Sequence, residues 1–133
     1  MGVPINVDVA DLHGAVAFYT GAFGLTVKRR LGARAAGSAG WPVPLFLLQQ
    51  EAGSVGAGDD RRAHERHRTP VHLDVVVDDI AGALSRAVGA GARVERDVRV
   101  EAWGKIAVPT DPFGHGLCPI EFLGRGHDEI APG

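Results

Sequence analysis

The hydrophobic and polar positions at the start of the chain change their spacing after the first ten residues. Ile5, Val7 and Val9 alternate with Asn6 and Asp8, a period of two that is typical of a strand with one buried face. Apolar residues then recur three or four positions apart up to Phe23, which indicates an amphipathic helix. The pattern therefore predicts a strand followed directly by a helix.

The same pattern returns in the second half of the chain. Leu73–Ala90 aligns without gaps on Ile5–Ala22, and an internal repeat of this kind predicts two copies of one structural unit. In both copies an aspartate precedes the helix, Asp11 or Asp79, where its side chain can cap the first turn. The identical pairs are Val7/Val75, Val9/Val77, Asp11/Asp79, Gly14/Gly82, Ala15/Ala83, Gly21/Gly89 and Ala22/Ala90.

Short strands are predicted in the rest of each copy. The predicted strands are Thr26–Leu31, Val43–Gln49, Val94–Val100, Ile106–Val108 and Cys118–Leu123. The Gly- and Ala-rich segment at 32–40 forms either a further strand or a mobile loop. We therefore predict an α+β fold with two tandem βαβββ modules in one domain, residues 1–133. Module one covers about 3–52, a linker 53–70, module two 71–124 and a C-terminal tail 125–133.

Composition and charge exclude several classes of protein. Hydrophobic residues make up 45% of the 133 residues and charged residues 23%, which are ordinary values for a folded globular domain. A net charge of −2 gives no field that would attract nucleic acid, and no apolar run is long enough for a membrane span. The single cysteine, Cys118, excludes an internal disulfide and favours the cytoplasm.

Several local motifs carry a resemblance to a known family. Phe18-Tyr19 and Phe23-Gly24-Leu25 lie in the first helix and its exit, and His72-Leu73-Asp74-Val75 begins the second copy. The remaining motifs are Trp103-Gly104-Lys105-Ile106-Ala107, Asp111-Pro112-Phe113-Gly114-His115-Gly116 and Ile120-Glu121-Phe122. With two βαβββ modules, these residues resemble the vicinal oxygen chelate superfamily, the glyoxalase/bleomycin-resistance/dioxygenase fold. The resemblance implies a concave mixed sheet around a small-molecule cavity, and a homodimer.

Enzymes of that superfamily hold a divalent metal on the concave face of the sheet, and the resemblance identifies two candidate ligands here. His72 stands at the start of module two and Glu121 on its last strand. The corresponding positions of module one carry Pro4 and the run from Leu45 to Gln49, so two expected ligands are absent. A shifted register would leave Asn6, Asp8, Gln49 or Glu51 as substitutes. We therefore expect no cofactor, with a divalent metal as the alternative.

The alternation of the strands also predicts a polar patch that faces the cavity. With the apolar residues under the helices, Asn6, Asp8, His72 and Asp74 point to the concave face, where they bind a ligand. The alternative for Asp8 and Asp74 is solvation at a rim, and for His72 it is a hydrogen bond to a neighbouring residue. Large aromatic side chains on a cavity wall can stack on planar ligands. For Trp41 and Trp103 the alternative is ordinary packing, and for Glu121 it is a cross-strand partner.

Three functions follow from these residues. The leading hypothesis is a protein that sequesters a small aromatic or antibiotic molecule without a metal, resembling bleomycin-resistance proteins. Its ligand-binding residues are Asn6, Asp8, Trp41, His72, Asp74, Trp103 and Glu121. The second is a metal-dependent glyoxalase-like lyase, isomerase or dioxygenase that uses His72 and Glu121. The third is a metal-free enzyme with Glu121 or His72 as general base. The expected partner in each case is a small organic molecule, neither nucleic acid nor membrane.

Overall fold

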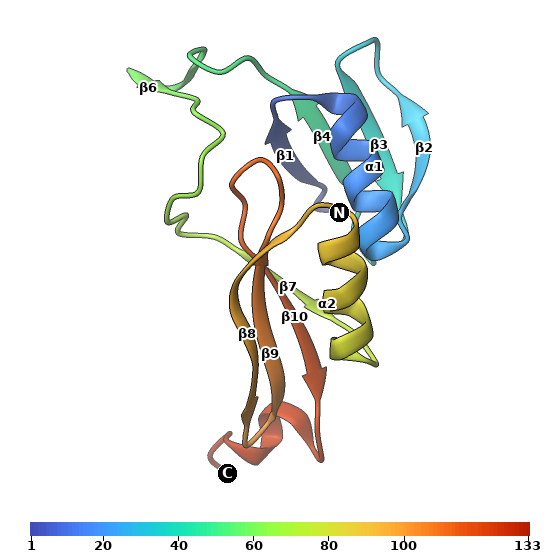
Figure 1. The fold of residues 1–133 in the computed structure, drawn as a ribbon, viewed down its shortest axis with the longest axis vertical. Helices are drawn as coiled ribbons and strands as arrows, with labels where there is room; N and C mark the ends of the chain where they lie inside the picture. Colours follow the sequence, from blue (N-terminus) through green and yellow to red (C-terminus); the bar gives the residue numbers. More distant parts are fainter. The chain divides into compact units, whose positions relative to one another are not determined.

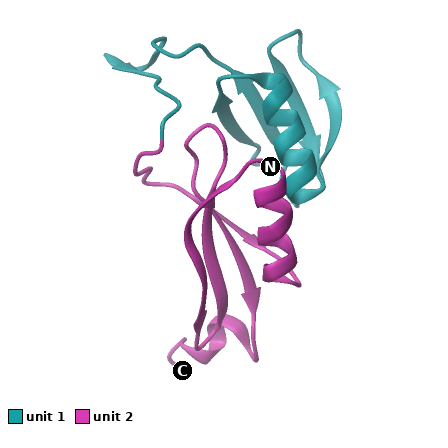
Figure 2. Ribbon diagram, in the orientation of Figure 1, with its two compact units in different colours: residues 1–65 teal, residues 66–133 magenta.

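The computed structural model describes all residues, 1–133, and divides into two compact units (Figures 1 and 2). Unit 1 covers residues 1–65 and unit 2 covers residues 66–133. Each unit contains one helix and one four-stranded mixed sheet. Neither helix is long and apolar enough to cross a membrane.

Unit 1 is built on a sheet with the strand order β1-β4-β3-β2. Its first and last strands, β1 and β4, run parallel, while the other neighbours are antiparallel. A short two-stranded hairpin, β5 with β6, follows this sheet within the segment predicted as a linker. The elements are β1 (Ile5–Val9), α1 (Leu12–Phe23), β2 (Thr26–Arg30), β3 (Ala35–Ala39), β4 (Leu45–Gln49), β5 (Val55–Ala57) and β6 (Asp60–Arg61).

Unit 2 repeats this topology with the strand order β7-β10-β9-β8. Its first and last strands, β7 and β10, are again the parallel pair. The elements are β7 (Leu73–Val76), α2 (Ile80–Gly89), β8 (Arg93–Glu101), β9 (Gly104–Thr110), β10 (Leu117–Phe122) and the 3-10 helix η1 (Gly126–Glu129). The α+β fold with two βαβββ modules is confirmed, and the ambiguous segment at 32–40 contains a strand, β3.

The two helices begin where the sequence pattern places them. Asp11 and Asp79 adopt extended backbone angles, and their carboxylates accept hydrogen bonds from the backbone N–H groups of His13 and Gly82. Gln49 adds a second cap to α1, because its Oε1 accepts a hydrogen bond of 2.9 Å from the N–H of Leu12. The caps satisfy N–H groups that have no partner within the helix. The bond from Leu12 to Gln49 also fixes the start of α1 against the end of β4.

The core of each unit lies between its helix and its sheet. In unit 1 the alternation of β1 is confirmed, because Val7 and Val9 are buried whereas Asn6 is exposed. Gly24 ends α1 with a φ of 68°, and its N–H donates to the carbonyl of Thr20, a left-handed turn that glycine adopts without strain. The largest fully buried side chains of unit 1 are Tyr19, Phe18, Leu45, Leu47 and Val9. One face of each sheet is thus covered by its helix.

Two glycines of unit 2 should respond in opposite ways to replacement by alanine. At Gly104, where β9 begins, an added Cβ would collide with the carbonyl oxygen of Glu121. We expect Gly104→Ala to lower the free energy of unfolding by about 1–3 kcal/mol, because backbone atoms must move apart. Gly89→Ala is the control: it lies in α2, where an added Cβ would meet no other group, and should stabilise by about 0.4–1 kcal/mol. Urea unfolding measures both, and equal effects would contradict this account.

Candidate functional site

The face of the unit 1 sheet that α1 does not cover carries two polar residues of β1, Asn6 and Asp8, each in its own cross-strand row. Cross-strand partners share a face of a sheet, and one row runs from Asn6 through Phe46 and Gly37 to Arg29. Asp8 lies in the next row on β1. Its Oδ2 accepts a hydrogen bond of 2.8 Å from Arg62 Nε, so this carboxylate is paired within unit 1. Asn6 is exposed beside Phe46.

An open groove lies at the β3–β4 end of unit 1 and has a volume of about 380 Å³. This volume is within the range of small-molecule sites, roughly 300–1,000 Å³. Two aromatic residues, Trp41 and Phe46, and two cationic residues, Lys28 and Arg29, contribute to its wall. The other lining residues are Gly37, Ser38, Ala39, Pro42 and Pro44. The groove therefore combines apolar surface with positive charge.

Trp41 has two roles in the geometry of unit 1. Its ring makes edge contacts with Tyr19 and Phe23 of α1, with centroids 6.5 Å and 5.4 Å away. It also lines the groove. The packing against α1 holds the indole in place, so the part that faces the groove is presented as a fixed surface.

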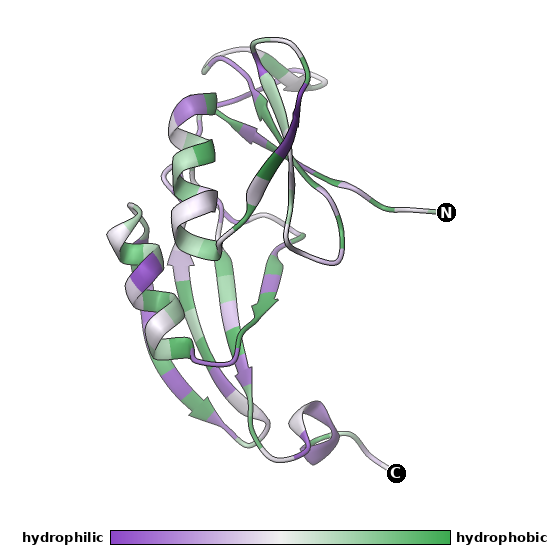
Figure 3. Cartoon of the chain, turned by 90° about the vertical axis from the view of Figure 1, so that its right-hand side faces the viewer, coloured by the Kyte–Doolittle hydropathy of each residue, from purple (hydrophilic) through white to green (hydrophobic).

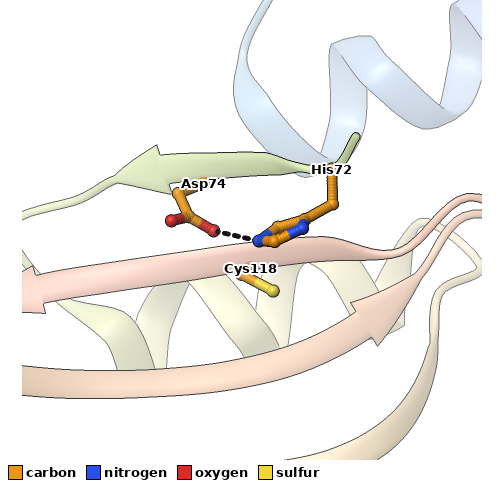
Figure 4. Close-up of side chains that lie close together, drawn as sticks. All are labelled: His72, Asp74 and Cys118. Atoms are coloured by element: carbon orange, nitrogen blue, oxygen red, sulfur yellow. Dashed lines mark ion pairs between the residues drawn. The ribbon is translucent and has the colours of Figure 1, made fainter. Parts of the chain in front are cut away.

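A second group of polar side chains meets in unit 2, where His72, Asp74 and Cys118 point toward one another (Figure 4). Asp74 of β7 and Cys118 of β10 are partners in the parallel register, and His72 precedes β7 on the same side. His72 Nε2 lies 3.4 Å from Asp74 Oδ1. One nitrogen, one oxygen and one sulfur atom from the three residues all lie within 4.8 Å of one another.

The environment of Cys118 keeps its thiol protonated. Burial raises the pKa of the thiol, and the negative charge of Asp74 raises it further, while Arg66 and Arg99 act in the opposite direction. Cys118 is buried, and its side chain stands beside Asp74 on the face of the sheet that carries His72. A protonated thiol is a poor nucleophile, so the cluster is better suited to binding than to attack.

Glu121 is not part of this cluster. Three positions after Cys118 on β10, it faces the other side of the strand, and its register partner on β9 is Lys105. Glu121 Oε2 is buried and lies 3.1 Å from Lys105 Nζ, in ionic contact but without a directed hydrogen bond. His72 and Glu121, the two ligands suggested by the resemblance, are therefore not brought together in this structure.

The remaining aromatic candidate, Trp103, and the histidine of the turn before β10 belong to other parts of unit 2. Trp103 packs against Phe122 and His127, with centroid distances of 6.3 Å and 5.0 Å, next to η1. His115 lies in the turn before β10, where its Nδ1 is 2.7 Å from Oδ2 of the buried Asp111. Cys118 is near the start of β10 and Phe122 is at its end, so Trp103 and the cluster occupy opposite ends of the strand.

The donor set of the cluster suits a borderline divalent metal. Imidazole, thiolate and carboxylate are the three ligand types that Zn²⁺ takes from proteins, and a site with three protein ligands leaves a position open for another molecule. A metal would also account for an aspartate, a histidine and a thiol that meet on an otherwise open sheet face. The cluster thus fits a metal better than the pair of His72 and Glu121.

Sequence reasoning missed Cys118 as a cluster member and Lys28 and Arg29 as groove residues. Cys118 was missed because its pairing with Asp74 depends on the register of β10 with β7, which the sequence pattern does not define. Lys28 and Arg29 were missed because strict alternation allows only one of two adjacent residues to face the groove.

Comparison with protein-family models matches residues 4–120 to the Glyoxalase-like domain. No curated protein sequence matches the chain. Many solved structures share its fold. A glyoxalase-related enzyme from Fulvimarina pelagi has a TM-score of 0.70 at 16% identity, over 91% of this chain and 87% of that one.

Two further structures show the same fold. A glyoxalase/bleomycin resistance protein/dioxygenase family enzyme from Burkholderia phytofirmans PsJN has a TM-score of 0.70 at 17% identity, over 90% of this chain and 97% of that one. Lactoylglutathione lyase from Agrobacterium tumefaciens has a TM-score of 0.63 at 20% identity, over 91% of this chain and 92% of that one. At such identities the likeness concerns the fold. Since the family model covers most of the sequence, this chain belongs to the glyoxalase-like domain family of the vicinal oxygen chelate superfamily.

Proposed function

We propose that this protein binds a small, partly aromatic organic molecule and holds it without chemical change. The observation that carries the proposal is the groove of about 380 Å³ in unit 1, with Trp41 and Phe46 in its wall. Aromatic walls supply contact area to a planar ligand and exclude water from it. The fixed packing of Trp41 against α1 supports binding, because a wall that is already ordered loses little entropy when a ligand arrives.

A polar residue on the open face of the unit 1 sheet has a place in this proposal as a group that orients the ligand. Asn6 is exposed next to Phe46 and can hydrogen-bond a polar substituent. Asp8 already has a partner in Arg62, so its contribution to ligand binding is smaller. His72 and Asp74 form a separate polar pair on the open face of unit 2, and Glu121 is paired with Lys105.

The two tryptophans provide a test of where the ligand binds. Trp103→Phe leaves Trp41 as the sole tryptophan of the chain, and we expect saturable quenching of its fluorescence by planar bicyclic aromatic probes. The matched variant Trp41→Phe retains Trp103, which packs on Phe122 and His127 and does not line the groove, so its fluorescence should respond weakly to the probes. Titration calorimetry should give one ligand per chain.

Two results of this titration would contradict the proposal. One is the absence of saturable quenching with neutral, anionic and cationic probes alike. The other is an equal response from the two single-tryptophan variants, which would place any binding elsewhere. Thermal unfolding of both variants checks that each remains folded.

The second candidate function is that of a metal-dependent lyase, isomerase or dioxygenase, and the convergence of His72, Asp74 and Cys118 favours it. In this version Cys118 takes the role that the family resemblance suggested for Glu121. A bound divalent metal would polarise an oxygen atom of a substrate. The three residues would hold the metal, and the structure gives no further group in a defined catalytic role.

Metal titration distinguishes this candidate from metal-free binding. If it is correct, Zn²⁺ binds one per chain, and Cys118→Ser weakens binding by more than the roughly tenfold to hundredfold that loss of an outer-shell partner costs. Because the raised pKa of the Cys118 thiol means that a proton must leave, the affinity should increase as the pH rises. Glu121→Gln serves as the control and should bind the metal like the wild type. Equal affinities of Cys118→Ser and the wild type would exclude the cluster.

The assembly and compartment belong to the same proposal. The family resemblance supports a homodimer, and the single thiol of Cys118 supports the reducing cytoplasm. Sedimentation equilibrium of the purified chain would decide the oligomeric state.

A further inference from the structure

The edge strand β2 presents two adjacent cationic residues to the groove of unit 1. In a regular strand, neighbouring side chains point to opposite faces. The register with β3 shifts between Val27 and Arg29, however, so Lys28 is the extra residue of a β-bulge. A bulge of this kind re-aims a side chain, and both Lys28 and Arg29 line the groove. Figure 3, in which β2 faces the viewer, shows hydrophilic colour along the second half of this strand.

The positive charge on these two residues is not neutralised within the protein. The ion pairs of unit 1 join Arg34 to Glu51 and Arg62 to Asp8, and neither Lys28 nor Arg29 has a carboxylate within ion-pair distance. No acidic residue lines the groove. Both side chains are therefore available to an anion from outside.

Gly37 lines the groove between these cations and the aromatic residues, and it contributes no side chain there. A Cβ placed on Gly37 would lie 2.8 Å from Phe46 Cε1 and 3.2 Å from Arg29 Cγ. Because Gly37 has no side chain, the Phe46 ring and the Arg29 stem both lie close to the backbone of β3. A planar ring system can approach such a surface face-on, with its edge near the cationic groups.

We propose that the groove of unit 1 takes a planar aromatic molecule that carries an anionic group, such as a carboxylate, sulfonate or phosphate. The aromatic part lies between Trp41 and Phe46, and the anion binds Lys28 and Arg29. This inference rests on the proposed small-molecule function and defines its ligand class. Arginine and lysine bind such anions through charge-assisted hydrogen bonds, which are stronger than neutral ones.

A pair of probes of equal shape tests the charge preference. 2-Naphthoate carries a carboxylate, and 2-naphthamide is its uncharged counterpart. We expect the wild-type chain to bind 2-naphthoate about tenfold more tightly than the amide, the difference that one charge-assisted hydrogen bond supplies. This preference should shrink as the ionic strength rises, because salt screens exposed charges.

Variants of β2 test which residues cause the preference for 2-naphthoate over 2-naphthamide. The double variant Lys28→Gln/Arg29→Gln should bind the two probes alike. Arg30→Gln removes the same charge type from the next residue of the strand, which does not line the groove, and should keep the full difference. Gly37→Ala tests the contribution of the groove surface at this position. Its added methyl group displaces the Phe46 ring and should weaken the binding of both probes. Thermal unfolding checks the fold of each variant.

Each outcome tests either the anionic ligand class or the proposed small-molecule function as a whole. Equal binding of naphthoate and naphthamide to the wild type would overturn the anionic ligand class and leave the small-molecule function standing. A preference that survives the double variant would overturn the assignment to Lys28 and Arg29. Failure of both probes and of 2-naphthylmethylammonium to bind at millimolar concentration would overturn the proposed function itself. A preference lost in the double variant and kept in Arg30→Gln supports the proposal.

Discussion

The parallel pairing of the first and last strands of each module determines which side chains meet. In a strand pair, a shift of one residue moves every side chain to the other face of the sheet. The β1–β4 and β7–β10 registers therefore set the groups available on the open faces. They bring Asn6 beside Phe46 in one unit and Asp74 beside Cys118 in the other. The open face of β1 and β4 and the cluster of unit 2 therefore depend on these two registers.

The sequence predicted the fold well because its signals are local. The alternation of Ile5, Val7 and Val9, the caps Asp11 and Asp79, and the turn at Gly24 each depend on residues close together in the chain. The internal repeat then showed that the same local unit occurs twice. Where the local signal is weak, as in the Gly- and Ala-rich β3, the sequence left two alternatives, and pairing with β2 and β4 decides between them.

The site was harder to predict because it depends on contacts between distant residues. Glu121 and Cys118 are both on β10, and the choice between them turns on the register with β7, which periodicity alone does not define. The groove depends on a bulge in β2, and a bulge violates the alternation from which facing residues are inferred. Trp41 and Trp103 look alike in sequence, yet one lines a groove and the other packs beside η1.

The contact between His115 and Asp111 has a chemical consequence for the turn before β10. Asp111 is fully buried and holds the ring nitrogen Nδ1 of His115. As a carboxylate, it can only accept, so the neutral imidazole keeps its hydrogen on Nδ1. The lone pair then resides on Nε2. The turn thus selects one of the two tautomers of His115, and any proton or metal ion that this side chain takes up must arrive at Nε2.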